Sequence, residues 1–389
     1  MTVSTLPQAA PRKHSPWRRF MSDAGFRDRL QRNAPIVAPA VALILLISVF
    51  ALLAPETFLS AGNIKNILSQ TAVLAFLATG VTFVLLVGEI DLSVANVAVL
   101  AGMMPSLLYI GQAIHVPPFG DLILGDNQLV AIGAGLLLCG ALGAVTGMLV
   151  SRLGVPSFIA TLGVMLLADG LSYYWAQGKR VYDLMPAVSA LGSGFIGPFP
   201  NIFISATVCL VLAHIVLSRT RFGRYVYMTG ANRTAAQLAG ISTRRVLLQV
   251  FIVAAVLSAM GGMINIGRMG SADARSGTEL LMPAIAAVVL GGTSVFGGIG
   301  GIPNTVVGLL LYGVLNNGLD QIDMDIYLKP FARGGFLILA IIFNIVALNL
   351  AARSRARAAE APASEAAAAA VPREAAPANP SSTASDHES

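Results

Sequence analysis

The stretch LVAIGAGLLLCGALGAVTGMLV, residues 129–150, decides the fold class of this chain. Its 22 residues include no charged side chain. An α-helix rises about 1.5 Å per residue, so about 20 apolar residues cross the ~30 Å hydrocarbon core of a bilayer. The stretch therefore predicts a membrane-spanning helix.

The rest of the chain repeats this pattern. It is 56% hydrophobic and only 11% charged, whereas a soluble domain carries about 25% charged residues. Apolar runs of spanning length lie at residues 36–54, 71–87, 92–110, 129–150, 157–177, 201–217, 246–266, 281–296, 300–319 and 331–350. We predict an all-α polytopic membrane protein with about ten transmembrane helices.

The basic residues lie at the flanks of these runs and predict an orientation. Residues 1–34 form a basic segment with seven Arg or Lys residues, 35–352 form the transmembrane domain, and 353–389 form a tail rich in Ala, Pro, Ser and Glu. An even number of spans puts both ends on one side. The predicted cytosolic segments then hold 18 of the 25 Lys and Arg residues, as the positive-inside rule requires. We expect an uncleaved first helix, a disordered cytosolic tail, and no nucleic-acid partner despite the net charge of +6.

Groups for covalent or metal chemistry are sparse. Cys139 and Cys209 lie inside apolar runs, and the four histidines are scattered, so no metal site and no catalytic residue is predicted. The glycine-rich segment 291–301 lacks the Lys and Ser/Thr that follow the glycines of a phosphate-binding loop. ATP hydrolysis, if transport requires it, is therefore expected on a separate chain.

The longest internal polar loop, residues 219–245, has the pattern of a short capped helix. Asn232 is a good N-cap, and Gly240 suits the left-handed conformation that ends a helix. We predict a helix of about two turns from Arg233 to Ala239, and Thr243 as the cap of the following membrane helix. Such a helix is unstable alone in water, so it needs a surface to lie against. Either it receives a partner, or the loop is a plain connector.

Three segments of this chain carry a family resemblance. They are FGRYVYMTGANRTAAQLAGI at 222–241, GEIDLSV at 88–94 and GGTSVFGGIGG at 291–301. In their order along the chain, 88–94, 222–241 and 291–301, they resemble the permease subunits of bacterial monosaccharide ABC importers of the ribose/xylose/galactose type. The likeness covers about residues 36–350.

This resemblance implies a type II ABC importer-like permease fold and a set of partners. These are a second copy of the permease, cytosolic ABC ATPase subunits that use ATP and Mg, a periplasmic solute-binding protein, membrane lipid, and a monosaccharide or polyol substrate. The chain itself would bind no cofactor. The short helix would be the coupling helix that docks on the ATPase, through Gly230, Asn232, Arg233, Ala235, Ala236, Leu238, Ala239, Gly240 and Ile241.

The other two motifs are expected to be structural or to take part in gating. Their residues are Gly88, Glu89, Asp91, Ser93, Gly291, Gly292, Gly297 and Gly298. The two acids fall in a tight turn at the predicted cytosolic interface, where Asp91 can cap the next helix. A role in gating or subunit contact is the alternative.

Polar residues inside the apolar runs are the candidates for the translocation pathway. Asp169 lies about 12 residues into its run, and Thr161 and Ser172 share its helical face. A polar stripe of this kind faces the bundle interior or an aqueous cavity. Thr79, Thr82 and Asn316 are further candidates, although such residues also join helices by hydrogen bonds. Asp169 could equally be bonded within the bundle.

Two other functions compete with an ABC permease. An ion-coupled secondary transporter needs carboxylates near the bilayer midplane, and only Asp169 qualifies. A membrane-embedded enzyme needs convergent His, Asp or Glu side chains, which the scattered histidines do not provide. Uptake into proteoliposomes separates an ABC permease, which needs ATP and a separate ATPase, from an ion-coupled transporter.

Overall fold

The computed structural model describes residues 34–116, 120–123, 125, 127–339 and 342. The predicted basic segment, apart from Ala34, and the predicted tail at 353–389 lie outside the described residues, so both stay predictions.

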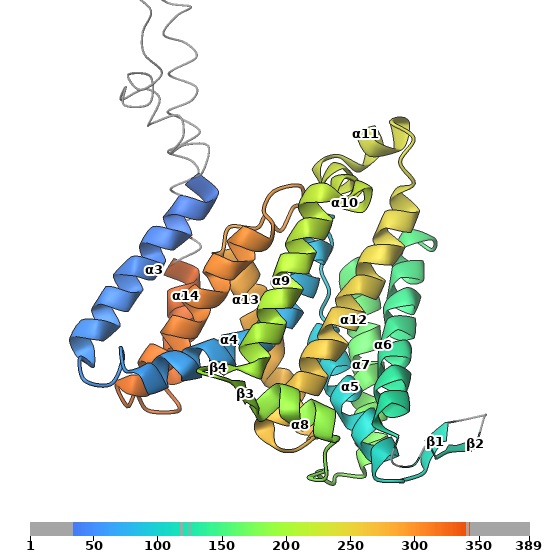
Figure 1. Ribbon diagram of the computed structural model, residues 1–389. Helices are drawn as coiled ribbons and strands as arrows, with labels where there is room; N and C mark the ends of the chain where they lie inside the picture. The colour runs from blue at the N-terminus through green and yellow to red at the C-terminus, as the bar shows by residue number, and fades with distance from the viewer. Residues whose placement is uncertain (1–33, 117–119, 124, 126, 340–341, 343–389) are drawn as a thin grey trace, which may run out of the picture.

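Long helices dominate the described chain and stand side by side (Figure 1). They are α3 (Ala34–Leu53), α4 (Ala61–Leu86), α5 (Val94–Tyr109), α6 (Gln128–Ser151), α7 (Ser157–Ala176), α9 (Asn201–Arg219), α12 (Thr243–Met269), α13 (Thr278–Leu290) and α14 (Ile302–Gln321). Residues 329–339 are also helical. Each predicted apolar run thus overlaps a helix, and the all-α character is confirmed.

Five of these helices are long and apolar enough to cross a bilayer: α4, α6, α7, α9 and α12. Residues 37–53 of α3 and the whole of α5 form shorter apolar helices. The chain is therefore a multi-pass membrane protein, and the count of about ten crossings stays a prediction.

Helices α5 and α13 are short for a bilayer. Their 16 and 13 residues correspond to about 24 and 20 Å of helix. Each contains a proline, Pro105 in α5 and Pro283 in α13. The prediction of one continuous helix over 281–296 is wrong, because α13 ends at Leu290 and a glycine-rich connection begins there.

Helices α4 and α12 form the centre of the bundle. In their most apolar segments 78% and 61% of the residues are buried, against 28–33% in α6, α7 and α9. Helix α12 packs against α4, α5 and α6, and its Gly262 lies directly against the backbone of Ala98. The outer helices therefore expose apolar faces, as expected of helices that contact lipid.

Short elements lie at the two ends of the bundle (Figure 1). Helices α10 (Arg221–Ala231) and α11 (Arg233–Leu238) occupy one end. The other end carries α8 (Pro186–Ser193), the 3-10 turn η1 (Ala274–Gly277), and two antiparallel strand pairs, β1 (Ile114–Val116) with β2 (Gly120–Leu122) and β3 (Phe195–Ile196) with β4 (Phe199–Pro200). None of these strands was predicted. Helix α4 runs toward the α11 end, and α12 runs away from it.

Candidate functional site

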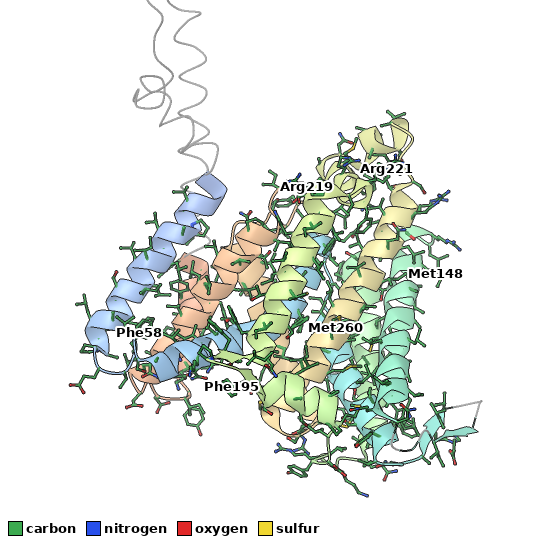
Figure 2. The ribbon with its side chains drawn as sticks, in the orientation of Figure 1. Phe58, Met148, Phe195, Arg219, Arg221 and Met260 are labelled. Atoms are coloured by element: carbon green, nitrogen blue, oxygen red, sulfur yellow. The ribbon has the colours of Figure 1, made fainter. Side chains whose placement is uncertain are left out.

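The three motifs that carry the family resemblance meet at the α11 end of the bundle. Segment 222–241 forms α10 and α11, segment 88–94 is the turn between α4 and α5, and segment 291–301 connects α13 to α14. Figure 2 shows Arg219 and Arg221 at this end, where α9 passes into α10. Although the motifs are about 60 to 210 residues apart in the chain, they build one surface.

The short helix α11 has the caps that its sequence predicts. The Asn232 side chain accepts a hydrogen bond from the backbone N–H of Ala235 at 2.9 Å. Gly240 has a φ of 79°, the left-handed conformation that ends a helix. The predicted cap-to-cap helix is confirmed.

Helix α10, which precedes α11, was not predicted from the sequence. Thr220 caps it by accepting from the N–H of Gly223 at 3.2 Å, and the Thr-x-x-Gly spacing was the available signal. The prediction that Thr243 caps α12 is wrong, because the residue before the first turn is Ser242. Thr243 instead accepts a hydrogen bond from the Gln237 amide at 3.0 Å, which ties α11 to α12.

Most of α11 is open to a partner, because five of its six residues are exposed. Ala236 is buried, and Ile241 packs against the cluster formed by α4, α9, α10 and α12. Leu238 is 86% exposed, and Ala235 and Ala239 are exposed beside it. The exposed face therefore offers one large apolar side chain between two small ones.

Backbone-to-backbone contacts join α10 to the last turn of α4. A Cβ on Gly230 would lie 1.8 Å from the Leu86 carbonyl oxygen, closer than any side chain allows. The same carbonyl accepts a hydrogen bond from the N–H of Gly298 at 2.9 Å. All three motifs thus converge within one turn of helix, where only glycine fits.

Further contacts hold the 291–301 connection against the other motifs. Gly297 has a φ of 92°, and its Cα faces the Gly230 carbonyl and the Gly88 N–H. The Tyr227 hydroxyl donates to the Gly300 carbonyl at 3.0 Å. Burial raises the pKa of Tyr227 above its ordinary value, which keeps this donor protonated. The connection is fixed, not a loose loop.

The start of this connection is fixed to α14. The Gly291 carbonyl accepts a hydrogen bond from the Asn304 amide at 3.0 Å, and the Cα of Gly291 lies against the Asn304 backbone. Gly292 follows with a φ of 93°. These two glycines therefore end α13 and turn the chain back toward the motif surface.

An ion pair links α11 to the turn after α4. The Arg233 guanidinium lies 2.5 Å from a carboxylate oxygen of Glu89. The Glu89 side chain is only 12% exposed, against 42% for Arg233. The sequence predicts Glu89 in this turn. It does not predict the pairing with Arg233, because 144 residues separate the two.

Asp91 organises the same turn from inside. Its carboxylate accepts from the Ser93 backbone N–H at 2.8 Å and from the Ser93 hydroxyl at 2.6 Å. Burial raises the pKa of Asp91, and the two Ser93 hydrogen bonds oppose that shift. The prediction that Asp91 caps the next helix is corrected, because Ser93 occupies the N-cap position of α5.

Four of the six predicted pathway residues are buried between helices in this single chain. The hydroxyls of Thr79, Thr82 and Ser172 bond to carbonyls one turn earlier in their own helices, at 2.6–2.7 Å. Thr82 also bonds Thr305 at 2.6 Å, and Thr161 lies 3.3 Å from the Phe158 carbonyl. These bonds are typical of helix packing, and their place in a pathway stays a prediction.

The other two pathway candidates differ from each other. Asp169 accepts a hydrogen bond from the Asn96 amide at 2.9 Å, so α5 and α7 are joined there, as the alternative reading had it. Asn316 lines a cavity and donates to Gln70 at 3.2 Å. Among the described residues, no group of three His, Cys, Asp or Glu side chains is placed to hold a metal ion.

Comparison with known proteins gives consistent relatives. Residues 63–346 match the family described as branched-chain amino acid transport system / permease component. The ribose import permease protein RbsC of Escherichia coli K12 is 36% identical over 309 residues, covering 78% of this chain and 92% of its own length. The D-allose transport system permease protein AlsC of the same strain is 35% identical, covering 77% and 88%. The galactose/methyl galactoside import permease protein MglC of Haemophilus influenzae is 32% identical, covering 81% and 94%. No solved structure matches.

Proposed function

Since this chain belongs to the family of branched-chain amino acid transport system permease components, we propose that it forms the membrane pathway for a monosaccharide or small polyol. It is a permease subunit of an ATP-binding cassette importer. Permease subunits of such transporters are not enzymes themselves, so ATP and Mg belong to a separate ATPase chain.

The sugar class is supported by the relatives rather than by the family description. The family description names branched-chain amino acids. The relatives that are 32–36% identical over most of the chain are instead named for ribose, allose and galactose. A neutral polyol also suits a pathway with amides and hydroxyls, because such groups exchange hydrogen bonds without trapping a charge.

The surface at α11 carries the proposal for coupling. Its exposed face would dock on the ATPase, and Leu238 would enter a groove of that subunit. A displacement of α11 would then reach α4 along two connections, the Arg233–Glu89 pair and the Gly230–Leu86 contact. Because α4 is central in the bundle, this route turns ATPase closure into rearrangement of the pathway.

We propose the assembly that this mechanism requires. Two copies of the chain would pair in the inner membrane, with two ATPases at the α11 end and a periplasmic solute-binding protein at the other. Both chain ends would then be cytosolic. The basic residues at the α11 end, such as Arg219 and Arg221 (Figure 2), support this orientation.

Reconstitution tests the proposed function. The permease, its ATPase and its binding protein are placed in proteoliposomes and offered labelled D-ribose, D-allose, D-galactose and L-arabinose. We expect uptake of at least one sugar that requires ATP and both partners and is unaffected by an ionophore. Uptake by the permease alone, driven by an ion gradient, would establish the ion-coupled alternative instead.

A further inference from the structure

A cavity of about 830 Å³ lies between α4, α13, α14 and the helix at 329–339. Its volume falls in the ~300–1,000 Å³ range of small-molecule sites. It extends from the end of α14 at Asp320 to residues 70–74 of α4, which are about 14–20 Å along that helix from its start. The cavity thus reaches well into the bundle from the end opposite to α11.

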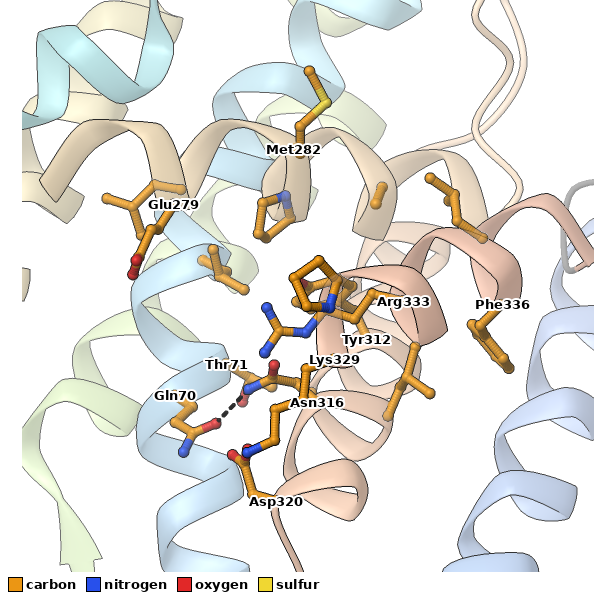
Figure 3. A pocket seen from close by; sticks show the side chains of 18 of the residues that line it. Gln70, Thr71, Glu279, Met282, Tyr312, Asn316, Asp320, Lys329, Arg333 and Phe336 are labelled. Atoms are coloured by element: carbon orange, nitrogen blue, oxygen red, sulfur yellow. Dashed lines mark hydrogen bonds and ion pairs between the residues drawn. The ribbon is translucent and has the colours of Figure 1, made fainter. Parts of the chain in front are cut away.

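Hydrogen-bonding groups from different helices meet in this cavity (Figure 3). Gln70 of α4 and Asn316 of α14 both line it, and the Asn316 amide donates to the Gln70 carbonyl at 3.2 Å. Each amide still has a free donor or acceptor site. Thr71 lies beside them, held close to α14 because Gly313 has no side chain there.

Arg333 adds a cation to this group. Figure 3 shows its side chain reaching from the helix at 329–339 into the space between α13 and α14. Its Nε is buried without a hydrogen-bond partner. Among the described residues it has no ion pair, whereas the neighbouring Lys329 is paired with Asp320 at 2.8 Å. A buried guanidinium nitrogen without a hydrogen-bond partner is available to a ligand in the cavity.

Much of the remaining wall is apolar and includes Tyr312, Leu315 and Phe336. The other charged residues that line the cavity are Arg268, Glu279, Asp320 and Lys329. A few convergent polar groups on apolar walls are typical of sites for small organic ligands. The planar guanidinium has several donors in a fixed fork, and neighbouring sugar hydroxyls offer acceptors at matching positions.

We propose that Arg333, Gln70 and Asn316 form a hydrogen-bonding site for the hydroxyl groups of a neutral monosaccharide inside each permease subunit. Arg333 donates to sugar oxygens, and the two amides accept from and donate to further hydroxyls. This inference rests on the proposed function, and it assigns the sugar to the cavity of one chain and not to the Asp169 seam.

Charged side chains of both signs line this cavity. Two carboxylates, Glu279 and Asp320, lie in the same lining as three cations, Arg268, Lys329 and Arg333, and Lys329 is paired with Asp320. The cavity is therefore not a field of one sign. A neutral sugar would use the Arg333 guanidinium through directed hydrogen bonds.

The test measures uptake by the assembled transporter in proteoliposomes. Arg333→Gln, Arg333→Lys and Asn316→Ala are compared with the wild type for D-ribose, 2-deoxy-D-ribose and 5-deoxy-D-ribose. We expect Arg333→Gln to lower kcat/KM for D-ribose by about ten-fold or more, because hydrogen bonds to a charged group are lost. The loss should be smaller for at least one deoxy sugar, which already lacks the hydroxyl concerned. Arg333→Lys should not restore the wild-type value, because it keeps the charge but loses the fork.

Arg275→Gln is the matched control, since Arg275 is exposed at the same end of the bundle and outside the cavity. It should leave uptake unchanged. ATPase activity without sugar reports folding, and Asn316→Ala carries the test if Arg333→Gln does not assemble. Equal losses for ribose and both deoxy sugars, or full recovery with Arg333→Lys, would overturn the proposal in favour of a structural or charge-binding role. If the wild type carries none of the sugars tested above, the proposed function fails first, and that outcome is distinct from these.

Discussion

The two ends of α4 are held in opposite ways. Its last turn is locked, because the Leu86 carbonyl lies against the backbones of Gly230 and Gly298. Its first half is tied to α14 by the amide pair of Asn63 and Asn317, and beside that contact Gln70 and Thr71 line a cavity of about 830 Å³. One helix therefore joins a closed end made of glycine and backbone to an open region made of polar side chains.

The difference matches the role that we propose for each region. A contact that transmits displacement has to be stiff, and close-packed backbone is stiffer than long side chains. A passage for a solute needs room and weak, exchangeable hydrogen bonds. A displacement at the locked end would thus be transmitted through α4 to the open region.

The sharpest way to break the locked end is to add one methyl group. Gly230→Ala places a Cβ against the Leu86 carbonyl at 1.8 Å, so the backbone must shift at a cost of about 1–3 kcal/mol. We expect a lower thermal unfolding midpoint of the purified permease and loss of ATP-driven uptake. Gly163→Ala is the control, since nothing lies within 4 Å of that position in α7. Equal behaviour of the two variants would contradict the locked contact.

The exposed face of α11 can be disrupted without touching the locked contact. Leu238→Glu changes a side chain that is 86% exposed, so folding should be unaffected. Docking should weaken by roughly 30-fold or more if Leu238 is a central contact worth about 2 kcal/mol. The measurement is co-purification of the ATPase subunit. Leu153→Glu, at a leucine between α6 and α7 that is 73% exposed, should leave assembly intact. Normal assembly of Leu238→Glu would remove α11 as the docking surface.

The ion pair between α11 and the turn after α4 can be tested by exchange of its charges. Glu89→Ala and Arg233→Ala should each reduce the uptake obtained per ATP hydrolysed. The pair itself is worth on the order of 1 kcal/mol, because Arg233 is partly exposed and water screens its charge. The combined Glu89→Arg and Arg233→Glu variant should recover part of the loss. If each single variant behaved as the wild type, coupling would depend on the glycine contact alone.

The smallest effect is expected far from the cavity, at Asp169. Asp169→Asn keeps an oxygen that can accept from the Asn96 amide, so the junction of α5 and α7 is preserved. Uptake should stay within about two-fold of the wild type and remain insensitive to a proton uncoupler. A large loss would move the pathway toward this seam and would revive the ion-coupled alternative.

Features that depend on neighbouring residues were predicted correctly from the sequence. The Asn232 cap and the Gly240 end of α11 depend on residues within one or two turns, so they were predictable. The three motifs also indicated the family, which the relatives confirm. Helix α10 was missed because its polar sequence shows no spanning run, and the Thr220 cap was not used.

The contacts between side chains on different helices could not be predicted from local sequence patterns. Ala236 resembles its neighbours Ala235 and Ala239 in the sequence, yet it alone is buried against the chain. Thr79 and Thr82 carry hydroxyls that could line a pathway, but both hydroxyls donate hydrogen bonds to carbonyls of their own helix. Arg333 stands near the start of the predicted run 331–350, and nothing in the sequence indicates that it lines the cavity.

By itself the sequence determined that this is a helical membrane protein with a short capped helix in a polar loop. Apolar run length and capping act over one helix or less, so no fold is needed to read them. Only the tertiary structure decided which residues meet: Glu89 with Arg233, Gly230 with Leu86, and Arg333 with the cavity of Gln70 and Asn316. These pairs are separated by up to about 260 residues, and their contact depends on how every intervening helix packs.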